Sequence, residues 1–302
     1  MTLYKYKICK YCKKTNEKII SLKHYFFKCN ECNIIFREEK NKKNLFYLFK
    51  NFSTFIRHFG EGKSKENQFD YYFNINKNDD YKNKKYYYIK DLLEENKNIK
   101  DILDISGAPG NIGYNLKKKF PINYDLTEYD YKIVNHLSGI FNLNCYQLDF
   151  DDLEKNNIPK NKEYDLIVLA HCIYYSKNIF ELIHFINSKL KKNGFLLISQ
   201  NKPNFATLTK FSIMEGYAPY VFYGSNFINN ILSDLNFFLI KEENEKLGNF
   251  IKHYFYDWSN KNKFIFSFLG YFLSLYYIIL NFMKIKKNDL ELENYYLLYR
   301  KK

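Results

Sequence analysis

The sequence predicts an α/β fold, a doubly wound parallel sheet preceded by a small cysteine-bearing module. One observation is the stretch from Asp101 to Gly113, where a β-branched run ends in small residues at a sharp turn from strand to helix. Two more short apolar stretches follow at 122–125 and 145–150, as expected for further strands. The third observation is a pair of Cys-x2-Cys motifs near the N-terminus.

The N-terminal cysteines have the spacing of two zinc knuckles. Cys9, Cys12, Cys29 and Cys32 form C-x2-C-x16-C-x2-C, which lets two pairs close a tetrahedral site. A disulfide pair or four unrelated thiols are the alternatives. Residues 1–7 carry no apolar signal core, which argues against an oxidising compartment and favours the cytoplasm. Because four cysteines leave no open coordination position, we expect a structural zinc ribbon over residues 1–42.

Residues 43–86 are predicted to connect this ribbon to the α/β domain. Leucine, isoleucine and phenylalanine recur at helical spacing from Leu45 to Phe59 and stop at Gly60, which predicts an amphipathic helix with a glycine C-cap. Residues 61–86 are polar and predict a flexible linker or a lid. A helix at the start of 87–302 then leads into the first strand of the domain.

The turn after the first strand is the predicted ligand site. Residues 106–110 are small, so a ligand can approach the backbone, and the next helix begins with free N–H groups at the same spot. Asp125 closes the second strand and can accept hydrogen bonds from ribose hydroxyls. Asp149 closes the third and can accept from an exocyclic amine, with Phe150 against a purine ring. Two carboxylates suit an adenosine without phosphates, because a pyrophosphate would be repelled.

Five motifs in this order resemble class I S-adenosylmethionine-dependent methyltransferases. Residues 102–113 resemble the first motif, usually Asp-x-Gly-x-Gly-x-Gly, and Asp125-Leu126-Thr127 resembles the ribose-binding motif. Residues 148–150 resemble the adenine-binding motif, 164–171 the fourth strand, and 190–198 the helix end, glycine turn and fifth strand. The resemblance implies a Rossmann-like, seven-stranded methyltransferase sheet whose last strand is antiparallel.

The resemblance also implies S-adenosylmethionine as the cofactor. The residues that it implies for cofactor binding lie in the turn and at the strand ends: Asp104, Ser106, Gly107, Ala108, Gly110, Asp125, Leu126, Asp149, Phe150 and Ala170. Ser106 and Ala108 depart from the pattern, since the family has glycines there. Both are small, which predicts reduced room at the turn rather than loss of the site.

The candidates for a catalytic base are His171, Tyr174 and Tyr175. The two tyrosines stand where related small-molecule methyltransferases often have Glu-His, so the obvious general base is absent and His171 at the strand end remains. A hydrogen-bonded rim histidine is the alternative interpretation. Because the sulfonium is already activated, methyl transfer can proceed largely by positioning.

The acceptor is predicted to be a small molecule or a carbohydrate or lipid-linked compound. Residues 200–204 resemble the Pro-Asn loop that borders the substrate pocket in this family, which makes Asn204, Tyr220 and Tyr223 candidates for the substrate side. The cysteine motifs resemble the ribbon that precedes some methyltransferases acting on sugars and other small metabolites.

Two other functions stay open. A zinc-bearing N-terminus also occurs on certain ribosomal RNA methyltransferases, and the net charge is +14. However, only three of the 47 basic residues are arginines. The arginine guanidinium group is the main side-chain group that binds phosphates and bases with two hydrogen bonds, so nucleic acid is not the expected partner. A catalytically inactive, methyltransferase-like binding protein is the second alternative, because Ser106 and Ala108 replace glycines.

A hydrophobic helical insertion is predicted at 250–287, before the last strand. Residues 264–283 are 20 consecutive uncharged residues, long enough to cross a bilayer. Residues 291–300 resemble the last strand, which must pair beside the strand at 237–241, and a single crossing would separate the two. We therefore expect 264–283 to cover the core, to join a homodimer, or to dock on a membrane surface, which would make the protein peripheral there.

Overall fold

The computed structural model describes residues 8, 9, 11–21, 24–37, 84–140, 143–150, 152–204, 207, 221–249 and 291–302. The predicted helix at 45–59, the linker and the apolar segment 264–283 lie outside these residues. Within the described ranges, no helix is both long and apolar enough to span a bilayer. The chain forms two compact units, which are taken separately below: an N-terminal unit of Met1–Lys40, Asn201–Gly224 and Glu243–Tyr295, and an α/β unit of Asn41–Gln200, Ser225–Glu242 and Tyr296–Lys302.

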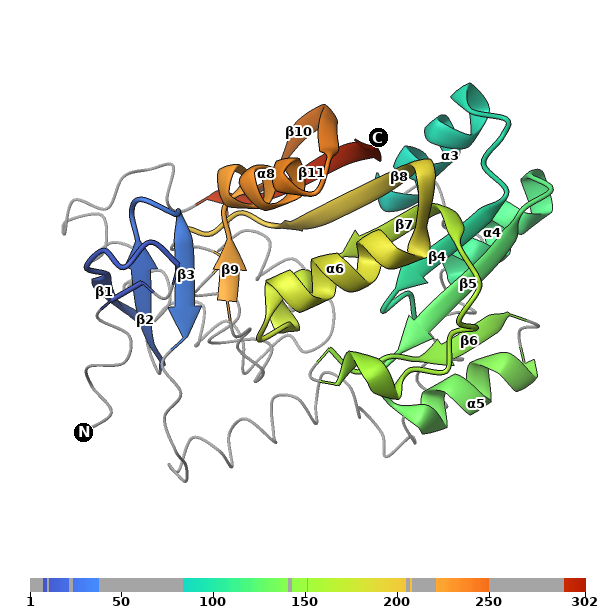
Figure 1. The fold of residues 1–302 in the computed structure, drawn as a ribbon, viewed down its shortest axis with the longest axis horizontal. Coiled ribbons are helices and arrows are strands. Elements are labelled where there is room, and N and C mark those ends of the chain that lie inside the picture. The colour runs from blue at the N-terminus through green and yellow to red at the C-terminus, as the bar shows by residue number, and fades with distance from the viewer. Residues whose placement is uncertain are drawn as a thin grey trace, which may run out of the picture. The chain divides into compact units, whose positions relative to one another are not determined.

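A seven-stranded sheet organises the α/β unit, in the order β10-β11-β8-β7-β4-β5-β6 (Figure 1). The neighbours from β8 to β6 pair in parallel, and the last strand, β11, is antiparallel. This confirms the predicted fold. The strands are β4 (Asp101–Ile105), β5 (Asn123–Glu128), β6 (Asn144–Gln147), β7 (Tyr164–Ala170), β8 (Leu190–Asn201), β10 (Phe237–Asn249) and β11 (Glu291–Lys301).

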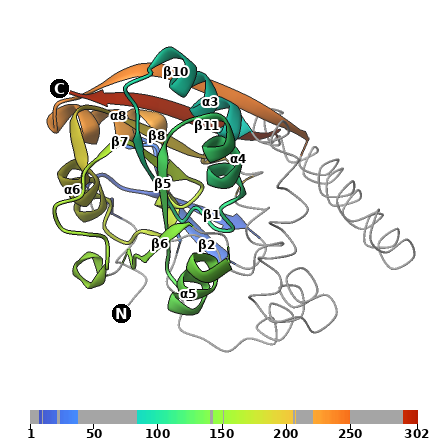
Figure 2. The same cartoon turned by 90° about the vertical axis from the view of Figure 1, so that its right-hand side faces the viewer.

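Helices alternate with these strands and cover both faces of the sheet. They are α3 (Lys84–Glu95), α4 (Asn111–Lys119), α5 (Tyr131–Ile140), α6 (Ile179–Lys189) and α8 (Ser225–Asp234), with short 3-10 turns at Leu153–Lys155 and Ile173–Tyr175. Helices α3 and α4 lie side by side (Figure 2), and their buried side chains share one apolar cluster with β4, β5, β7 and β8. Coverage of both faces is why β4 is mostly apolar, with Ile102, Leu103 and Ile105 fully buried, and why its one inner polar residue, Asp104, is fully buried as well.

Some boundaries differ from those that the sequence predicts. Helix α3 begins at Lys84, within the predicted linker, and β10 extends to Asn249. Strand β8 starts directly after α6, at Leu190, where the end of the helix was expected. The most consequential difference is in β5, which continues through three residues after Asp125 and ends at Glu128.

The N-terminal unit contains a second, four-stranded antiparallel sheet, in the order β1-β2-β3-β9. Its first three strands are β1 (Glu17–Ser21), β2 (His24–Cys29) and β3 (Ile34–Arg37). The fourth, β9 (Val221–Tyr223), comes from far along the chain. The N-terminal sheet therefore takes its fourth strand from outside residues 1–42.

Candidate functional site

The turn after β4 is tied to the end of β5 by backbone hydrogen bonds. The Ser106 N–H donates to Thr127 Oγ1 at 3.2 Å, and the Gly107 N–H donates to the Thr127 carbonyl at 3.2 Å. Ser106 has φ 56° and Gly110 has φ 87°, so both adopt the left-handed conformation that favours glycine. The family's first glycine is thus replaced here by a serine that keeps a glycine-like backbone.

Asp104 lies directly beneath this turn and is fully buried. Lys85 Nζ contacts its two carboxylate oxygens at 2.6 and 2.7 Å, and the Tyr124 hydroxyl donates to Oδ2 at 2.7 Å. Burial and the Asp104 charge raise the pKa of Tyr124 well above its usual value, so this hydroxyl stays protonated. A Cβ on Gly107 would lie 2.6 Å from the Asp104 carboxylate. Asp104 therefore supports the turn from within and holds α3 and β5 against it.

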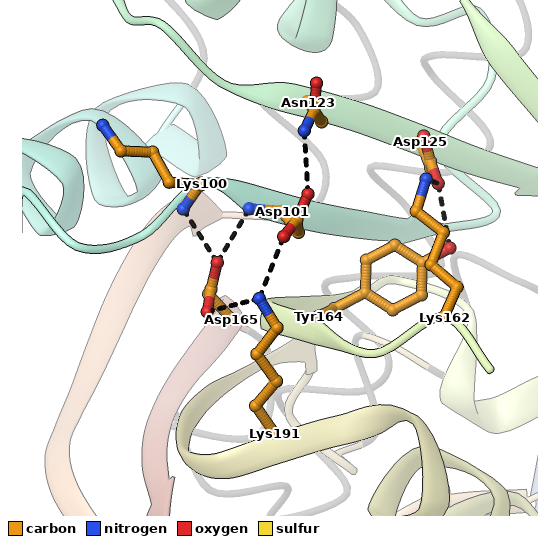
Figure 3. Close-up of polar contacts among 8 residues, drawn as sticks. All are labelled: Lys100, Asp101, Asn123, Asp125, Lys162, Tyr164, Asp165 and Lys191. Atoms are coloured by element: carbon orange, nitrogen blue, oxygen red, sulfur yellow. Dashed lines mark hydrogen bonds and ion pairs between the residues drawn. The ribbon is translucent and has the colours of Figure 1, made fainter.

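Asp125 does not lie at the end of its strand, so the prediction that it closes β5 is wrong. It is the third residue of the strand and is fully buried. Asn144 Nδ2 donates to Oδ1 at 2.8 Å. Figure 3 shows the two contacts of Oδ2, which accepts from the Tyr164 hydroxyl at 2.9 Å and pairs with Lys162 Nζ. These partners stand at or just before the beginnings of β6 and β7, so Asp125 belongs to the amino half of the sheet.

Glu128 occupies the place that the sequence assigned to Asp125. It is the last residue of β5, in register with Gln147 at the end of β6, and it is half-buried. Its Oε1 accepts a hydrogen bond from the Tyr129 N–H at 2.9 Å. Burial and then the Glu128 charge raise the pKa of Cys145, on the neighbouring strand β6, to about 12.

Sequence reasoning missed Glu128 because Asp125 completes an apparent apolar stretch. The signal that could have located it is the start of α5 at Tyr131. Loops between a strand and the following helix are short, so a strand end near Glu128 is the better prediction.

The other predicted cofactor residues lie around the same strand ends or beneath them. The Leu148 N–H donates to the Glu128 carbonyl at 3.0 Å, which ties the segment bearing Asp149 to the end of β5. Asp149 and Phe150 are half-buried. The remaining two are core or near-core residues: Leu126 is buried in a cluster against which Ala108 packs, and Ala170 ends β7.

The three candidates for a catalytic base follow β7. His171 is half-buried with φ 56°, and its backbone N–H donates to the Ser199 carbonyl at 2.7 Å. Tyr174 is buried, whereas Tyr175 is 36% exposed, and their rings meet edge to face at 4.7 Å. Of the two tyrosines, Tyr175 is the one with substantial access to a ligand.

Two of the three predicted substrate-side residues, Asn204 and Tyr223, are described. Asn204 Oδ1 accepts from the Thr207 N–H at 2.9 Å, as in a helix cap. Tyr223 is fully buried in β9, and its carbonyl accepts from the Tyr295 hydroxyl at 2.9 Å. The substrate-side role of both residues stays a prediction, and Tyr220 lies outside the described residues.

The four N-terminal cysteines come together as a cluster. Their sulfur atoms lie within 4.8 Å of one another, with Cys12 and Cys29 at 3.4 Å and Cys9 and Cys32 at 3.9 Å. None of the four is in a disulfide, and the Cys32 N–H donates to Cys29 Sγ at 3.4 Å. A zinc ion with Zn–S bonds of about 2.3 Å holds its sulfurs roughly 3.8 Å apart, so these thiols fit a tetrahedral zinc site.

Several solved structures are similar to this chain. The MccD protein has a solved structure that matches with a TM-score of 0.51, 17% identity, and coverage of 71% of this chain and 96% of that chain. A SAM-dependent methyltransferase from Archaeoglobus fulgidus matches at 0.46 and 17%, over 72% and 94% of the two chains. Phosphoethanolamine N-methyltransferase 2 of Haemonchus contortus, in complex with S-adenosyl-L-methionine, matches at 0.46 and 16%, over 67% and 48%.

Sequence comparison identifies the family. Among curated proteins no sequence matches. A family model described as a methyltransferase domain matches residues 79–242, which contain the turn, Glu128 and His171. The chain therefore belongs to the methyltransferase domain family and is a methyltransferase.

Proposed function

We propose that this protein transfers a methyl group from S-adenosylmethionine to a small-molecule or carbohydrate or lipid-linked acceptor. The proposal rests on the hydrogen bonds that join the turn after β4 to the end of β5. Ser106 and Gly107 both donate to Thr127, the residue before Glu128, so the small-residue turn and a half-exposed carboxylate share one edge of the sheet. The carboxyl edge of a parallel sheet is where such folds bind ligands.

Each part of the cofactor has a chemically suitable partner at this edge. The Glu128 carboxylate can accept hydrogen bonds from both ribose hydroxyls, as an ionised carboxylate offers only acceptors. Asp149 can accept from the adenine amine, with Phe150 against the ring. The first turn of α4, which follows Gly110, offers N–H groups to the methionine carboxylate. When bound, the sulfonium supplies an activated methyl group, so the remaining task of the chain is alignment and proton removal.

His171 is the proposed acceptor of the proton that leaves the substrate. Its backbone is fixed by the hydrogen bond to Ser199 on the neighbouring strand β8, so its position after β7 is set by the sheet. Tyr175, being exposed, is proposed to line the acceptor side. We also propose that the four-cysteine cluster holds a structural zinc ion, because four thiolates would leave no coordination position for a substrate.

Calorimetric titration with S-adenosylmethionine tests the cofactor, and two variants in one strand sharpen the test. Glu128→Ala should raise the Kd at least about tenfold, since the ribose loses its acceptor. Asp125→Asn is the matched control, because it removes one carboxylate charge from the same strand; it should lower the Tm and change the Kd by less than about threefold. No binding by the wild type, or the reverse order of the two variants, would contradict the assignment.

The class of acceptor is tested by methyl transfer from radiolabelled S-adenosylmethionine into a fractionated cell extract. We expect the label in small-molecule, glycan or lipid fractions. Label recovered in RNA, with activity that falls steeply as salt increases, would instead favour the RNA methyltransferase alternative.

A further inference from the structure

The cysteine cluster is connected to β9 through β3. Strand β3 begins at Ile34, shortly after Cys32, and pairs antiparallel with β9. The register places Ile34 opposite Tyr223, Ile35 opposite Phe222 and Phe36 opposite Val221, and all six residues are buried. The order of β9 therefore depends on a strand that leaves directly from the second cysteine knuckle.

Residues within and next to the cysteine motifs make further contacts with β9 and the residue after it. Tyr11, between Cys9 and Cys12, stacks on Phe36 with ring centroids 6.0 Å apart, and its hydroxyl lies beside that of Tyr223. After β9, a Cβ on Gly224 would lie 2.6 Å from the Asn33 amide nitrogen, so the chain there packs directly on the turn before β3. Both knuckles thus contact residues 221–224.

The end of β8 is held differently from β9 within the N-terminal unit. The Lys202 N–H donates to the Glu293 carbonyl at 2.8 Å, and Lys202 Nζ pairs with Glu293 Oε2 at 2.7 Å. Asn201 Nδ2 donates to Asn294 Oδ1 at 2.8 Å. Asn201 and Lys202 therefore depend on β11, whereas β9 depends on β3 and through it on the cysteine cluster.

We propose that the four-cysteine metal centre is a conformational anchor for the distant strand β9. A metal ion in this cluster would fix the two knuckles, the knuckles fix β3, and β3 fixes β9. Small sheets of this kind have little core of their own and commonly depend on their metal for folding. The dependence of β9 on the metal rests on the proposed zinc ion and not on the proposed methyl transfer.

The test is hydrogen exchange by mass spectrometry on the full chain, loaded with zinc and after removal of zinc by a chelator. In the metal-free protein, we expect exchange in β3 and β9 to be at least about tenfold faster, because their shared order is lost. Exchange in β4, at the centre of the other sheet, should change less than about twofold. The Kd for S-adenosylmethionine should change less than about threefold, since its proposed residues lie in the α/β unit.

Variants keep the test independent of the chelator. The double change Cys29→Ser with Cys32→Ser should abolish zinc binding and reproduce the fast exchange in β9. Cys145→Ser is the matched control, because Cys145 lies in the α/β unit outside the cluster, and it should keep both zinc and protection.

Three results would overturn the proposal: no zinc bound by the wild type, β9 still protected without metal, or β4 losing protection together with β9. If β9 responds to the metal but the zinc-loaded protein fails to bind S-adenosylmethionine, the anchor stands and the proposed cofactor fails.

Discussion

The two edges of the parallel sheet use carboxylates in opposite ways. At the amino edge, Asp101 and Asp165 share the ammonium group of Lys191, and the buried Asp125 is enclosed by Lys162 and Tyr164 (Figure 3). At the carboxyl edge, Glu128 and Asp149 remain half-exposed beside the turn. Asp125 and Glu128 stand in the same strand, where Asp125 is buried in the middle and Glu128 is half-buried at the end, so the surroundings of an acid change with its position along the strand.

The amino-edge network also completes the backbone hydrogen bonding at the start of β4. Asp165 Oδ2 accepts from the Lys100 and Asp101 N–H groups, both at 2.9 Å. Lys191 Nζ lies 2.9 Å from both Asp101 Oδ2 and Asp165 Oδ1, and Asn123 Nδ2 donates to Asp101 Oδ1 at 2.9 Å. The start of β4 is therefore held in place by side chains of the same edge.

The largest expected effect comes from Asp125→Ala. The change leaves the Lys162 charge and the Tyr164 hydroxyl without their buried acceptor, and should lower the free energy of unfolding by about 3 kcal/mol. Urea unfolding followed by circular dichroism measures this loss. Asp152→Ala, which removes a carboxylate paired with the highly exposed Lys155, is the control and should leave stability nearly unchanged. Equal losses in the two variants would remove the distinction between buried and exposed acids.

Lys85→Met tests the support beneath the turn. Asp104 would remain buried with only the Tyr124 hydroxyl as a described side-chain partner, which should cost about 2 kcal/mol of unfolding free energy. Thermal unfolding measures the effect. Lys90→Met in the same helix is the control, because Lys90 pairs with the exposed Glu94. If both variants unfold at the wild-type temperature, Asp104 does not need Lys85.

Lys191→Met should weaken the amino edge in a pH-dependent way. Burial raises the pKa of Asp101, but hydrogen bonds from Asn123 and Lys191 outweigh it and hold this pKa below its ordinary value. A depressed folded-state pKa gives stability that is present above the ordinary value, about 3.9, and is lost as the pH falls through the folded value.

The variant should therefore be about 1 kcal/mol less stable than the wild type at pH 7, allowing for the partial exposure of Lys191. The difference should shrink as the pH falls from about 4 through the lowered pKa of Asp101, because the Asp101–Lys191 ion pair is lost when Asp101 becomes protonated in the folded wild type. Urea unfolding at pH 7 and at pH 3 makes the comparison. An unchanged gap at pH 3 would mean that Lys191 acts through packing.

Ser106→Gly should have the smallest effect, and it concerns the carboxyl edge. The left-handed conformation at φ 56° costs a serine free energy, whereas glycine adopts it freely. The free energy of unfolding of the glycine variant should therefore be higher by up to about 1 kcal/mol. Asn236→Gly, at φ 63°, is the control, and it should gain less because asparagine tolerates this region. Calorimetry on the same variant shows whether a glycine also tightens S-adenosylmethionine binding. A loss of stability in Ser106→Gly would show that the Ser106 side chain holds the turn.

The sheet could be predicted because buried parallel strands are nearly continuous apolar runs, as Ile102 to Ile105 show. The cysteine cluster could be predicted because its ligands are close in sequence. The end of β5 could not be found in this way, since polar residues follow Leu126 inside the strand. The burial of Asp125 arises from Asn144 and Tyr164, in other strands, and from Lys162, just before β7, so it depends on tertiary contacts.

Strand β9 was missed for a related reason. Its three residues, Val221 to Tyr223, are too few to show a periodic pattern, and their partner strand begins far away at Ile34. The same distance explains why Tyr223 looked like a pocket residue: nothing local reveals the sheet that buries it.

The pairing of β3 with β9 has a consequence for recombinant expression. A chain trimmed to begin at residue 79 would keep the region matched by the family and lose β1, β2 and β3. The apolar strand Val221–Tyr223 would then present an uncovered edge, which is a template for aggregation. We expect the chain that begins at residue 79 to accumulate in inclusion bodies. A chain that begins at residue 8, and so keeps β1, β2 and β3, should stay soluble.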